Sequence, residues 1–167
     1  MSSRFTASFH LPSERATAQF AATMAPLLGP GDCLLLKGPV GAGKSHFARS
    51  LIQARLAARG LEEDVPSPTF TLVQTYSDGI TEIWHADLYR LSDTSEVVEL
   101  GLEDAFQTAI SMIEWPEKLG DLTPPNALSL RFSPGKSETA RDLEISGPTG
   151  WQRRLVPIMT ASVGAHE

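Results

Sequence analysis

The sequence predicts a single α/β domain in which helices flank a mixed β-sheet. Its 167 residues suit one domain with one hydrophobic core. The segment CLLLKG at 33–38 is apolar at consecutive positions, as in a strand that is buried on both faces. Helical patterns precede and follow it, and two later hairpin signals indicate antiparallel pairs. We therefore expect residues 1–160 to form one domain, with a disordered tail at 161–167.

The N-terminal part predicts a strand and a helix before the buried strand, and a second helix after it. Alternating apolar residues over RFTASFHL, 4–11, indicate a half-buried strand. Ser13 is the expected N-cap of a helix that GPGD at 29–32 ends. The apolar face of this helix consists of Ala16, Phe20, Met24 and Leu27. The second helix should run from Lys44 to about Arg59 and stop at Gly60.

The C-terminal part predicts two hairpins, a buried strand and two helices. TFTLVQTY at 69–76 and ITEIWHADLY at 80–89 are β-rich and flank the turn residues Ser77-Asp78-Gly79. A short helix should begin near Thr94, before the apolar strand AISMIEW at 109–115. The second hairpin joins ALSLRF at 127–132 to ARDLEIS at 140–146, and a last helix is expected at 151–159.

The stretch GPVGAGKS at 38–45 matches the pattern G-x-x-x-x-G-K-S and predicts a P-loop NTPase. It lies between the buried strand and a helix, where backbone N–H groups and the helix N-terminus can surround a phosphate. Glycines let the backbone approach the anion without a Cβ in the way. Lys44 would contact the β- and γ-phosphates, and the Ser45 hydroxyl would bind Mg²⁺. The predicted nucleotide-binding residues are Gly38, Gly41, Ala42, Gly43, Lys44, Ser45 and His46.

A P-loop also needs an acid for the metal, normally at the end of an apolar strand. Glu114 ends SMIE and is the best candidate for this metal ligand, while Asp87 ends IWHAD and is the second. Which of the two positions the attacking water stays open. Thr69 in SPTF is either a switch threonine that senses the γ-phosphate or part of a strand entry fixed by prolines. His85 lacks partners at zinc-ligand spacing, so no zinc site is expected.

Several function classes are disfavoured by what the chain lacks. A net charge of −6 without a basic stripe argues against a free-standing nucleic-acid binder, so any role in a nucleic-acid pathway should involve protein contacts. The sole asparagine, Asn126, is not part of an N-K-x-D motif, which excludes a standard GTPase. The segment after the P-loop helix reads as a loop and hairpin rather than the arginine-rich lid of a small-molecule kinase.

The composition indicates a cytoplasmic protein. No apolar stretch approaches the roughly 20 residues of a membrane span, and the N-terminus lacks the apolar region of a signal peptide. The single cysteine, Cys33, rules out an internal disulfide and suits a reducing compartment. We expect no contact with a membrane.

Four motifs in this order resemble the bacterial TsaE (YjeE) ATPases of tRNA threonylcarbamoyladenosine biosynthesis. They are GPVGAGKS, SPTFTLVQTY, HADLYRL and IEWPEKL, and the resemblance covers roughly Leu11 to Leu119. It implies a Mg²⁺-dependent ATPase whose hydrolysis of ATP is weak without its partners. The resemblance also implies that the protein acts with the TsaD–TsaB assembly and reaches tRNA only through it. TsaE does not itself transfer the threonylcarbamoyl group to adenosine 37. A small-molecule kinase and a nucleotide-dependent binding module without turnover are the alternatives.

Residue by residue, the resemblance supports the roles inferred from the motifs. It implies Lys44 and Ser45 at the phosphates and metal, Glu114 as a metal-site acid, and both Thr69 and Asp87 as functional residues. Trp115 is implied as support beside the nucleotide. This chain departs from the family in having Pro39-Val40 for an acid and leucine, Ser45 for threonine, and Ala86 for phenylalanine. Serine retains the hydroxyl that magnesium needs, and Ala86 affects local packing rather than chemistry.

Overall fold

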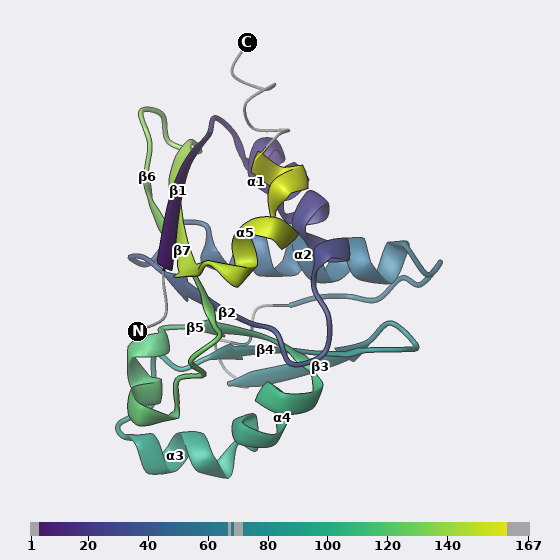
Figure 1. Ribbon diagram of the computed structural model, residues 1–167, viewed down its shortest axis with the longest axis vertical. Coiled ribbons are helices and arrows are strands. Elements are labelled where there is room, and N and C mark those ends of the chain that lie inside the picture. The colour runs from purple at the N-terminus through teal and green to yellow at the C-terminus, as the bar shows by residue number, and fades with distance from the viewer. Residues whose placement is uncertain (1–3, 67, 69–71, 160–167) are drawn as a thin grey trace.

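The computed structural model describes residues 4–66, 68 and 72–159 and contains a mixed sheet with helices on both faces (Figure 1). Within these residues the sheet has seven strands in the order β1-β7-β6-β2-β5-β4-β3. This confirms the predicted fold class. In that order the strands are β1 Arg4–Leu11, β7 Arg141–Pro148, β6 Leu128–Pro134, β2 Cys33–Lys37, β5 Ile110–Glu114, β4 Glu82–Asp87 and β3 Val73–Ser77.

The middle of the sheet is parallel. β2 pairs in parallel with both β5 and β6, and β5 pairs in parallel with β4. Antiparallel pairs β3–β4, β6–β7 and β1–β7 complete the two sides. Because parallel strands end at the same edge, Leu36 of β2 pairs with Glu114 of β5, which in turn pairs with Asp87 of β4. Both predicted acids therefore lie at the same end of the sheet as the C-terminal end of β2.

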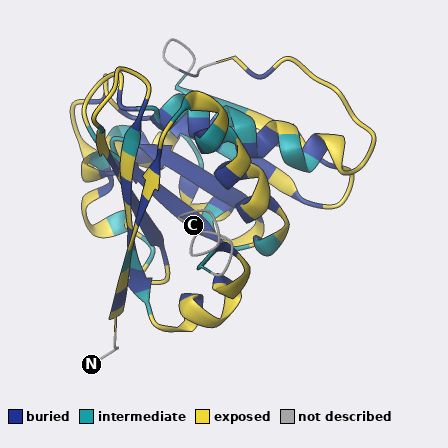
Figure 2. Ribbon diagram, turned by 90° about the horizontal axis from the view of Figure 1, so that it is seen from above, coloured by how far each residue is buried: buried dark blue, intermediate teal, exposed yellow. Residues whose placement is uncertain are grey.

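The residues of β2 alternate between two hydrophobic clusters, which explains why the strand is apolar throughout. Leu34 and Leu36 pack in the larger cluster, and Cys33 and Leu35 in the smaller one on the other face. Buried residues occupy the strands between the helical layers (Figure 2). The larger cluster lies under α1 Glu14–Met24, η1 Ala25–Leu27, α2 Lys44–Ala57 and α5 Gly150–Arg154. The smaller lies under α3 Thr94–Glu99, α4 Leu102–Thr108 and η2 Pro116–Leu122.

Both predicted hairpins are confirmed, with boundaries that are shifted in each; in the second, the strands run over Leu128–Pro134 and Arg141–Pro148. The expected strand at 69–76 is described only from Val73, because residues 69–71 lie outside the described part of the chain. Its turn centres on Asp78, whose Oδ1 accepts hydrogen bonds from the backbone N–H groups of Ile80 and Thr81. The partner strand ends at Asp87, and the backbone N–H of the next residue, Leu88, still donates to the Glu114 carbonyl of β5.

The helices differ from expectation in four places. α4 and the 3₁₀ segment η2 were not predicted from the sequence. The last helix, expected at 151–159, is instead α5 at Gly150–Arg154, and after a turn at Leu155 residues 156–159 are helical again. α2 ends at Ala57, two residues before the expected end, and Gly60 follows in the left-handed conformation. The tail expected at 161–167 lies outside the described residues.

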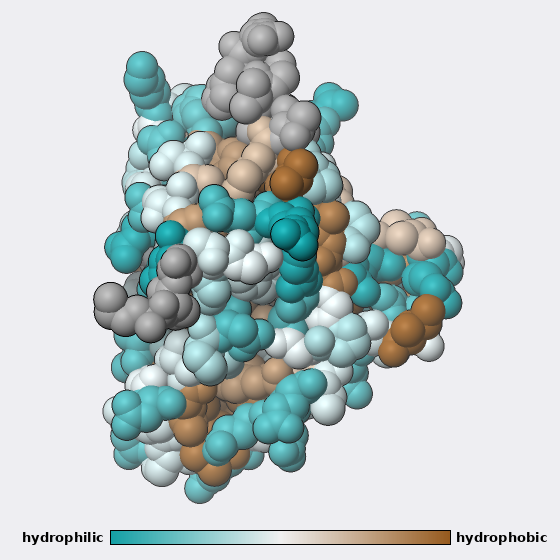
Figure 3. All heavy atoms as spheres, viewed as in Figure 1, coloured by the Kyte–Doolittle hydropathy of each residue, from teal (hydrophilic) through white to brown (hydrophobic). Residues whose placement is uncertain are grey.

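The surface shows no large hydrophobic belt in the view of Figure 3. Hydrophilic residues predominate there, and hydrophobic ones form separate small patches, one of them near α3 at the lower end. Among the residues that the structure describes, no helix is both long and apolar enough to cross a membrane.

Two glycines of the loop between β2 and α2 provide a test of how closely β6 packs against this loop. A Cβ on Gly38 would lie 2.5 Å from the Phe132 carbonyl oxygen of β6, whereas a Cβ on Gly41 would meet nothing within 4 Å. Both have positive φ, so either alanine substitution should cost about 1–2 kcal/mol of backbone strain. Because of the steric clash, we expect Gly38→Ala to lower the free energy of unfolding, measured with urea, by about 1–3 kcal/mol more than Gly41→Ala does. Equal losses of stability in the two variants would show that β6 can move away from the added methyl group at little cost.

Candidate functional site

The loop from Gly38 to Gly43 connects the end of β2 to the start of α2, as the motif predicts. Gly41 and Gly43 have φ of +79° and +100°, which residues with a Cβ rarely adopt. Gly43 is the N-cap of the 14-residue helix α2, so the positive end of the helix dipole faces this loop. The loop is also turned back on itself, because the Ala42 N–H donates to the Pro39 carbonyl. Such a loop can accept an anion through its backbone N–H groups.

Lys44 lies back across this loop rather than extending into solvent. Its Nζ donates to the Gly38 carbonyl over 2.6 Å and lies 3.7 Å from the centre of the Trp115 ring, a cation–π contact. The residue is only 4% exposed. Burial lowers the pKa of Lys44, and the negative charges of Glu114 and Asp87 oppose this shift. The ammonium is therefore held next to the loop by contacts that an anionic ligand can replace.

Glu114 connects the P-loop to the central strands. Its carboxylate accepts from the Ser45 Oγ at 2.9 Å and 2.8 Å, and its Oε2 also lies 2.7 Å from His85 Nε2. Glu114 is 3% exposed and His85 is completely buried. His85 Nδ1 has no hydrogen-bond partner, so the neutral ring with its proton on Nε2 leaves no buried N–H unsatisfied. His85 is thus a hydrogen-bond donor that fixes the carboxylate, a role the sequence did not indicate.

The oxygens of Ser45 and Glu114 fit the demands of Mg²⁺. Neighbouring ligands of an octahedral Mg²⁺ at about 2.0–2.1 Å lie about 2.9 Å apart, close to the observed separations of 2.8 and 2.9 Å. Both groups are oxygen donors, as this hard cation prefers. Among the described residues, no three or more His, Cys, Asp or Glu side chains lie close enough together to hold a metal ion by themselves. A Mg²⁺ ion bound by Ser45 and Glu114 would take its remaining ligands from phosphates and water.

Asp87 lies beside this pair on β4. Its Oδ1 accepts from the Tyr89 backbone N–H at 3.0 Å, which orients the carboxylate at the strand end. Tyr89 is 56% exposed, and its ring lies 4.9 Å from that of Trp115. Trp115 has a φ of +57°, an uncommon conformation for a residue with a Cβ. This backbone conformation, which no sequence pattern signals, brings the indole beneath Lys44.

His46, predicted to bind the nucleotide, makes a different contact. Its Nε2 lies 2.9 Å from the Glu14 carbonyl and so joins the start of α2 to the start of α1. The ring still lines the same cavity as the P-loop residues. Thr69, the predicted switch residue, lies outside the described residues.

A cavity of about 450 Å³ brings these groups together. It joins the P-loop, both acids and Trp115 to three residues that sequence reasoning missed, namely Glu14, Tyr89 and Arg141. The full lining comprises Glu14, Val40, Gly41, Gly43, Lys44, Ser45, His46, Asp87, Tyr89, Glu114, Trp115 and Arg141. Its backbone N–H groups, cation and acid–hydroxyl pair can together bind a phosphate and a divalent cation.

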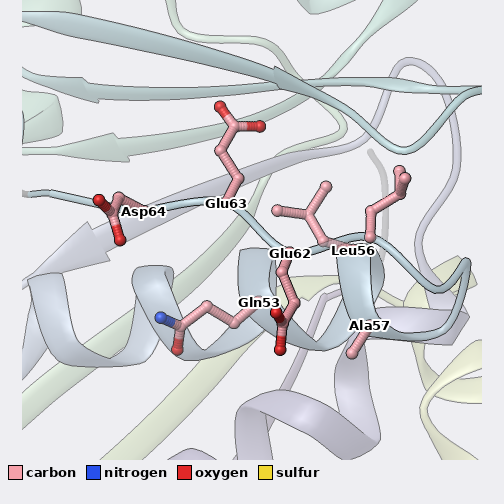
Figure 4. A pocket seen from close by; sticks show the side chains of 7 residues that line it. Gln53, Leu56, Ala57, Glu62, Glu63 and Asp64 are labelled. Atoms are coloured by element: carbon pink, nitrogen blue, oxygen red, sulfur yellow. The ribbon is translucent and has the colours of Figure 1, made fainter.

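A larger hollow of about 530 Å³ lies elsewhere, between the end of α2 and the segment that follows it (Figure 4). Three successive acids, Glu62, Glu63 and Asp64, line it, and their side chains point in different directions. None of the described residues that line it is basic. Because this charge repels anions and the acids do not converge, the smaller cavity is the candidate site.

Comparisons with known proteins agree on one family. The family model described as "Threonylcarbamoyl adenosine biosynthesis protein TsaE" matches residues 11–143. A protein of Rickettsia bellii named tRNA threonylcarbamoyladenosine biosynthesis protein TsaE is 41% identical over 114 residues, which cover 68% of this chain and 77% of the relative. The protein of the same name from Haemophilus influenzae is 30% identical over 153 residues, which cover 88% and 93%.

A solved structure supports the fold. The crystal structure of YdiB from Bacillus subtilis matches with a TM-score of 0.77 and covers 96% of this chain and 99% of that chain. Sequence identity is 20%, so this likeness concerns the fold alone. The P-loop NTPase architecture predicted from the sequence is confirmed.

The buried contact between His85 and Glu114 can be tested through stability. His85→Leu removes a donor to a buried carboxylate and should cost about 1.5–3 kcal/mol in urea unfolding at neutral pH. His85→Gln keeps an N–H group near the position of Nε2 and should recover part of this loss. His10→Leu is the matched control, because the exposed pair of His10 with Asp142 should contribute at most about 1 kcal/mol. Equal losses at both positions would contradict a special role for the buried pair.

Proposed function

This chain belongs to the TsaE family, and from this we propose that it is a Mg²⁺-dependent ATPase required for threonylcarbamoylation of adenosine 37 in tRNAs. The Ser45–Glu114 pair beside Lys44 carries the proposal, because it places a metal-binding oxygen pair next to a phosphate-binding loop. We assign the whole activity to one domain, residues 1–160. The transfer of the threonylcarbamoyl group belongs to partner proteins, and this chain supplies ATP turnover.

Lys44 and the loop amides bind the triphosphate. On binding, the Lys44 ammonium exchanges the Gly38 carbonyl for β- and γ-phosphate oxygens, while the Trp115 ring supports its side chain. The N–H groups of the loop and of the first turn of α2 donate to the same phosphates. Gly38, Gly41, Ala42, Gly43 and His46 complete the nucleotide site, in which positive φ at three glycines shapes the backbone.

Ser45 and Glu114 hold the metal. The Ser45 hydroxyl and the Glu114 carboxylate provide two neighbouring oxygens, and His85 keeps the carboxylate in place. Mg²⁺ held by this pair would neutralise the negative charge that develops on the phosphates during hydrolysis.

Asp87 orients the attacking water. The Glu114 carboxylate accepts hydrogen bonds from Ser45 and His85. Among the described residues, Asp87 accepts one only at Oδ1, from the Tyr89 N–H. We assign the other oxygen of Asp87 to the water. The water oxygen forms a bond to the γ-phosphorus, the bond from this phosphorus to the bridging oxygen breaks, and ADP leaves. The proton of the water passes through Asp87 to the released phosphate.

The partner is the TsaD–TsaB assembly, through which the protein acts on tRNA in the cytoplasm. A net charge of −6 suits an approach to tRNA through other proteins. Val40 and Tyr89 are 78% and 56% exposed at the mouth of the cavity, where a partner can contact the nucleotide site. We propose that Thr69 senses the γ-phosphate and its metal and so reports the nucleotide state to this partner.

The proposal is tested by measuring ATP turnover with and without the TsaD–TsaB assembly. We expect weak turnover alone and a marked rise with the assembly. Lys44→Ala should abolish nucleotide binding or turnover while circular dichroism stays unchanged, because its loss leaves the phosphate charge uncompensated. Turnover that rises with a small acceptor instead would identify a kinase, and binding without turnover in all conditions would identify a binding module.

Glu114→Gln separates metal binding from nucleotide binding. The amide removes the charge that holds Mg²⁺, so Mg²⁺-dependent hydrolysis should fall about a hundredfold. ADP affinity without metal should change less than about threefold, because the loop amides and Lys44 remain. Calorimetry and a phosphate-release assay measure the two effects. Equal losses in both would indicate a structural role for Glu114.

A further inference from the structure

The hairpin β6–β7 forms one wall of the P-loop, although no sequence motif assigns it a role. The Phe132 carbonyl of β6 lies so close to Gly38 that a Cβ there would approach it to 2.5 Å. β7 begins with Arg141, whose side chain contacts the other end of the same loop. The C-terminal hairpin thus contacts the loop at both ends.

Within the described part of the chain, the hydrogen bonds that Arg141 donates all go to backbone carbonyls. Its Nε donates to the Ala42 carbonyl at 2.8 Å and its Nη2 to the Gly41 carbonyl at 3.0 Å. Its Nη1 donates to the carbonyls of Glu138 and Ala140 in the hairpin loop. Among the residues that the structure describes, no carboxylate forms an ion pair with this guanidinium. The planar group therefore joins two loops through its geometry rather than through a charge partner.

These bonds fix the direction of a peptide unit in the P-loop. In a planar trans peptide the carbonyl and the next N–H point in opposite directions. The Ala42 carbonyl faces Arg141, so the Gly43 N–H is directed away from it. Gly41 and Gly43 both have positive φ and, as glycines, impose little conformational preference of their own. The contact with Arg141 supplies the restraint that the glycines lack.

We propose that Arg141 is a positioning residue that holds the P-loop in its anion-binding conformation before the nucleotide arrives. The C-terminal hairpin is then part of the nucleotide site, and its function is to preorganise the loop. The part of this inference that concerns nucleotide affinity rests on the proposed function. A loop that is already ordered loses less conformational entropy when it binds a phosphate.

The experiment compares Arg141→Ala with Arg131→Ala, an exposed arginine on β6 of the same hairpin. Calorimetry with ADP and with Mg²⁺–ATP should show affinities about tenfold weaker for Arg141→Ala and unchanged for Arg131→Ala. Amide hydrogen exchange without nucleotide should be faster at residues 41–44 in Arg141→Ala only. Thermal unfolding of each variant checks that the fold persists.

Arg141→Lys distinguishes positioning from a direct charge effect on the nucleotide. Lysine keeps the charge but cannot donate to the Gly41 and Ala42 carbonyls from a planar fork, so it should lose most of the affinity as well. Wild-type affinity in Arg141→Lys, or unchanged affinity and exchange in Arg141→Ala, would overturn the inference. Absence of nucleotide binding by the wild type would instead contradict the proposed function, while faster exchange in Arg141→Ala would still support the loop restraint.

Discussion

The parallel pairing of β5 with both β2 and β4 is the constraint on which the site depends. It brings the C-terminal ends of three strands together at one end of the sheet. Each strand end supplies one part of the candidate site: the P-loop after β2, Glu114 on β5 and Asp87 on β4. A shift of β5 by one residue would turn Glu114 to the other face of the sheet and away from Ser45. Every residue of β5 is buried, so such a shift would also disrupt the packing on both faces of the sheet.

Electrostatics explain why so acidic a site can accept a phosphate. Three carboxylates line the cavity, against the two basic side chains of Lys44 and Arg141, and the whole chain carries a charge of −6. The N-terminus of α2 and the guanidinium of Arg141 add positive potential on the loop side of the cavity. Two of the three acids, Asp87 and Glu114, lie on the neighbouring strands β4 and β5, where a divalent cation would compensate them. The two halves of the site thus favour opposite charges, which matches a metal–phosphate ligand better than a free anion.

The sequence predicted the parts of the site that local patterns encode. The P-loop follows from its glycines between a strand and a helix, and the position of Glu114 follows from its place at the end of a buried strand. The roles of His85 and Arg141 could not be predicted, because their contacts with Glu114 and Ala42 span 29 and 99 residues and depend on strand order. The left-handed backbone conformation of Trp115 could not be predicted either, since nothing in IEWPEKL requires it. Long-range contacts of this kind need the assembled sheet.

The order of strands in the sheet also has a consequence for how the chain folds as it leaves the ribosome. β1 pairs only with β7, so that Arg4 meets Pro148, and one edge of β2 is covered only by β6. Until the last hairpin has been synthesised, both strands present unpaired backbone groups that can pair with other chains. Closure of the sheet is thus a late and slow step dominated by contacts distant in sequence. A nascent chain cannot hold its P-loop against the hairpin before β7, which begins at Arg141 and ends at Pro148, has been translated.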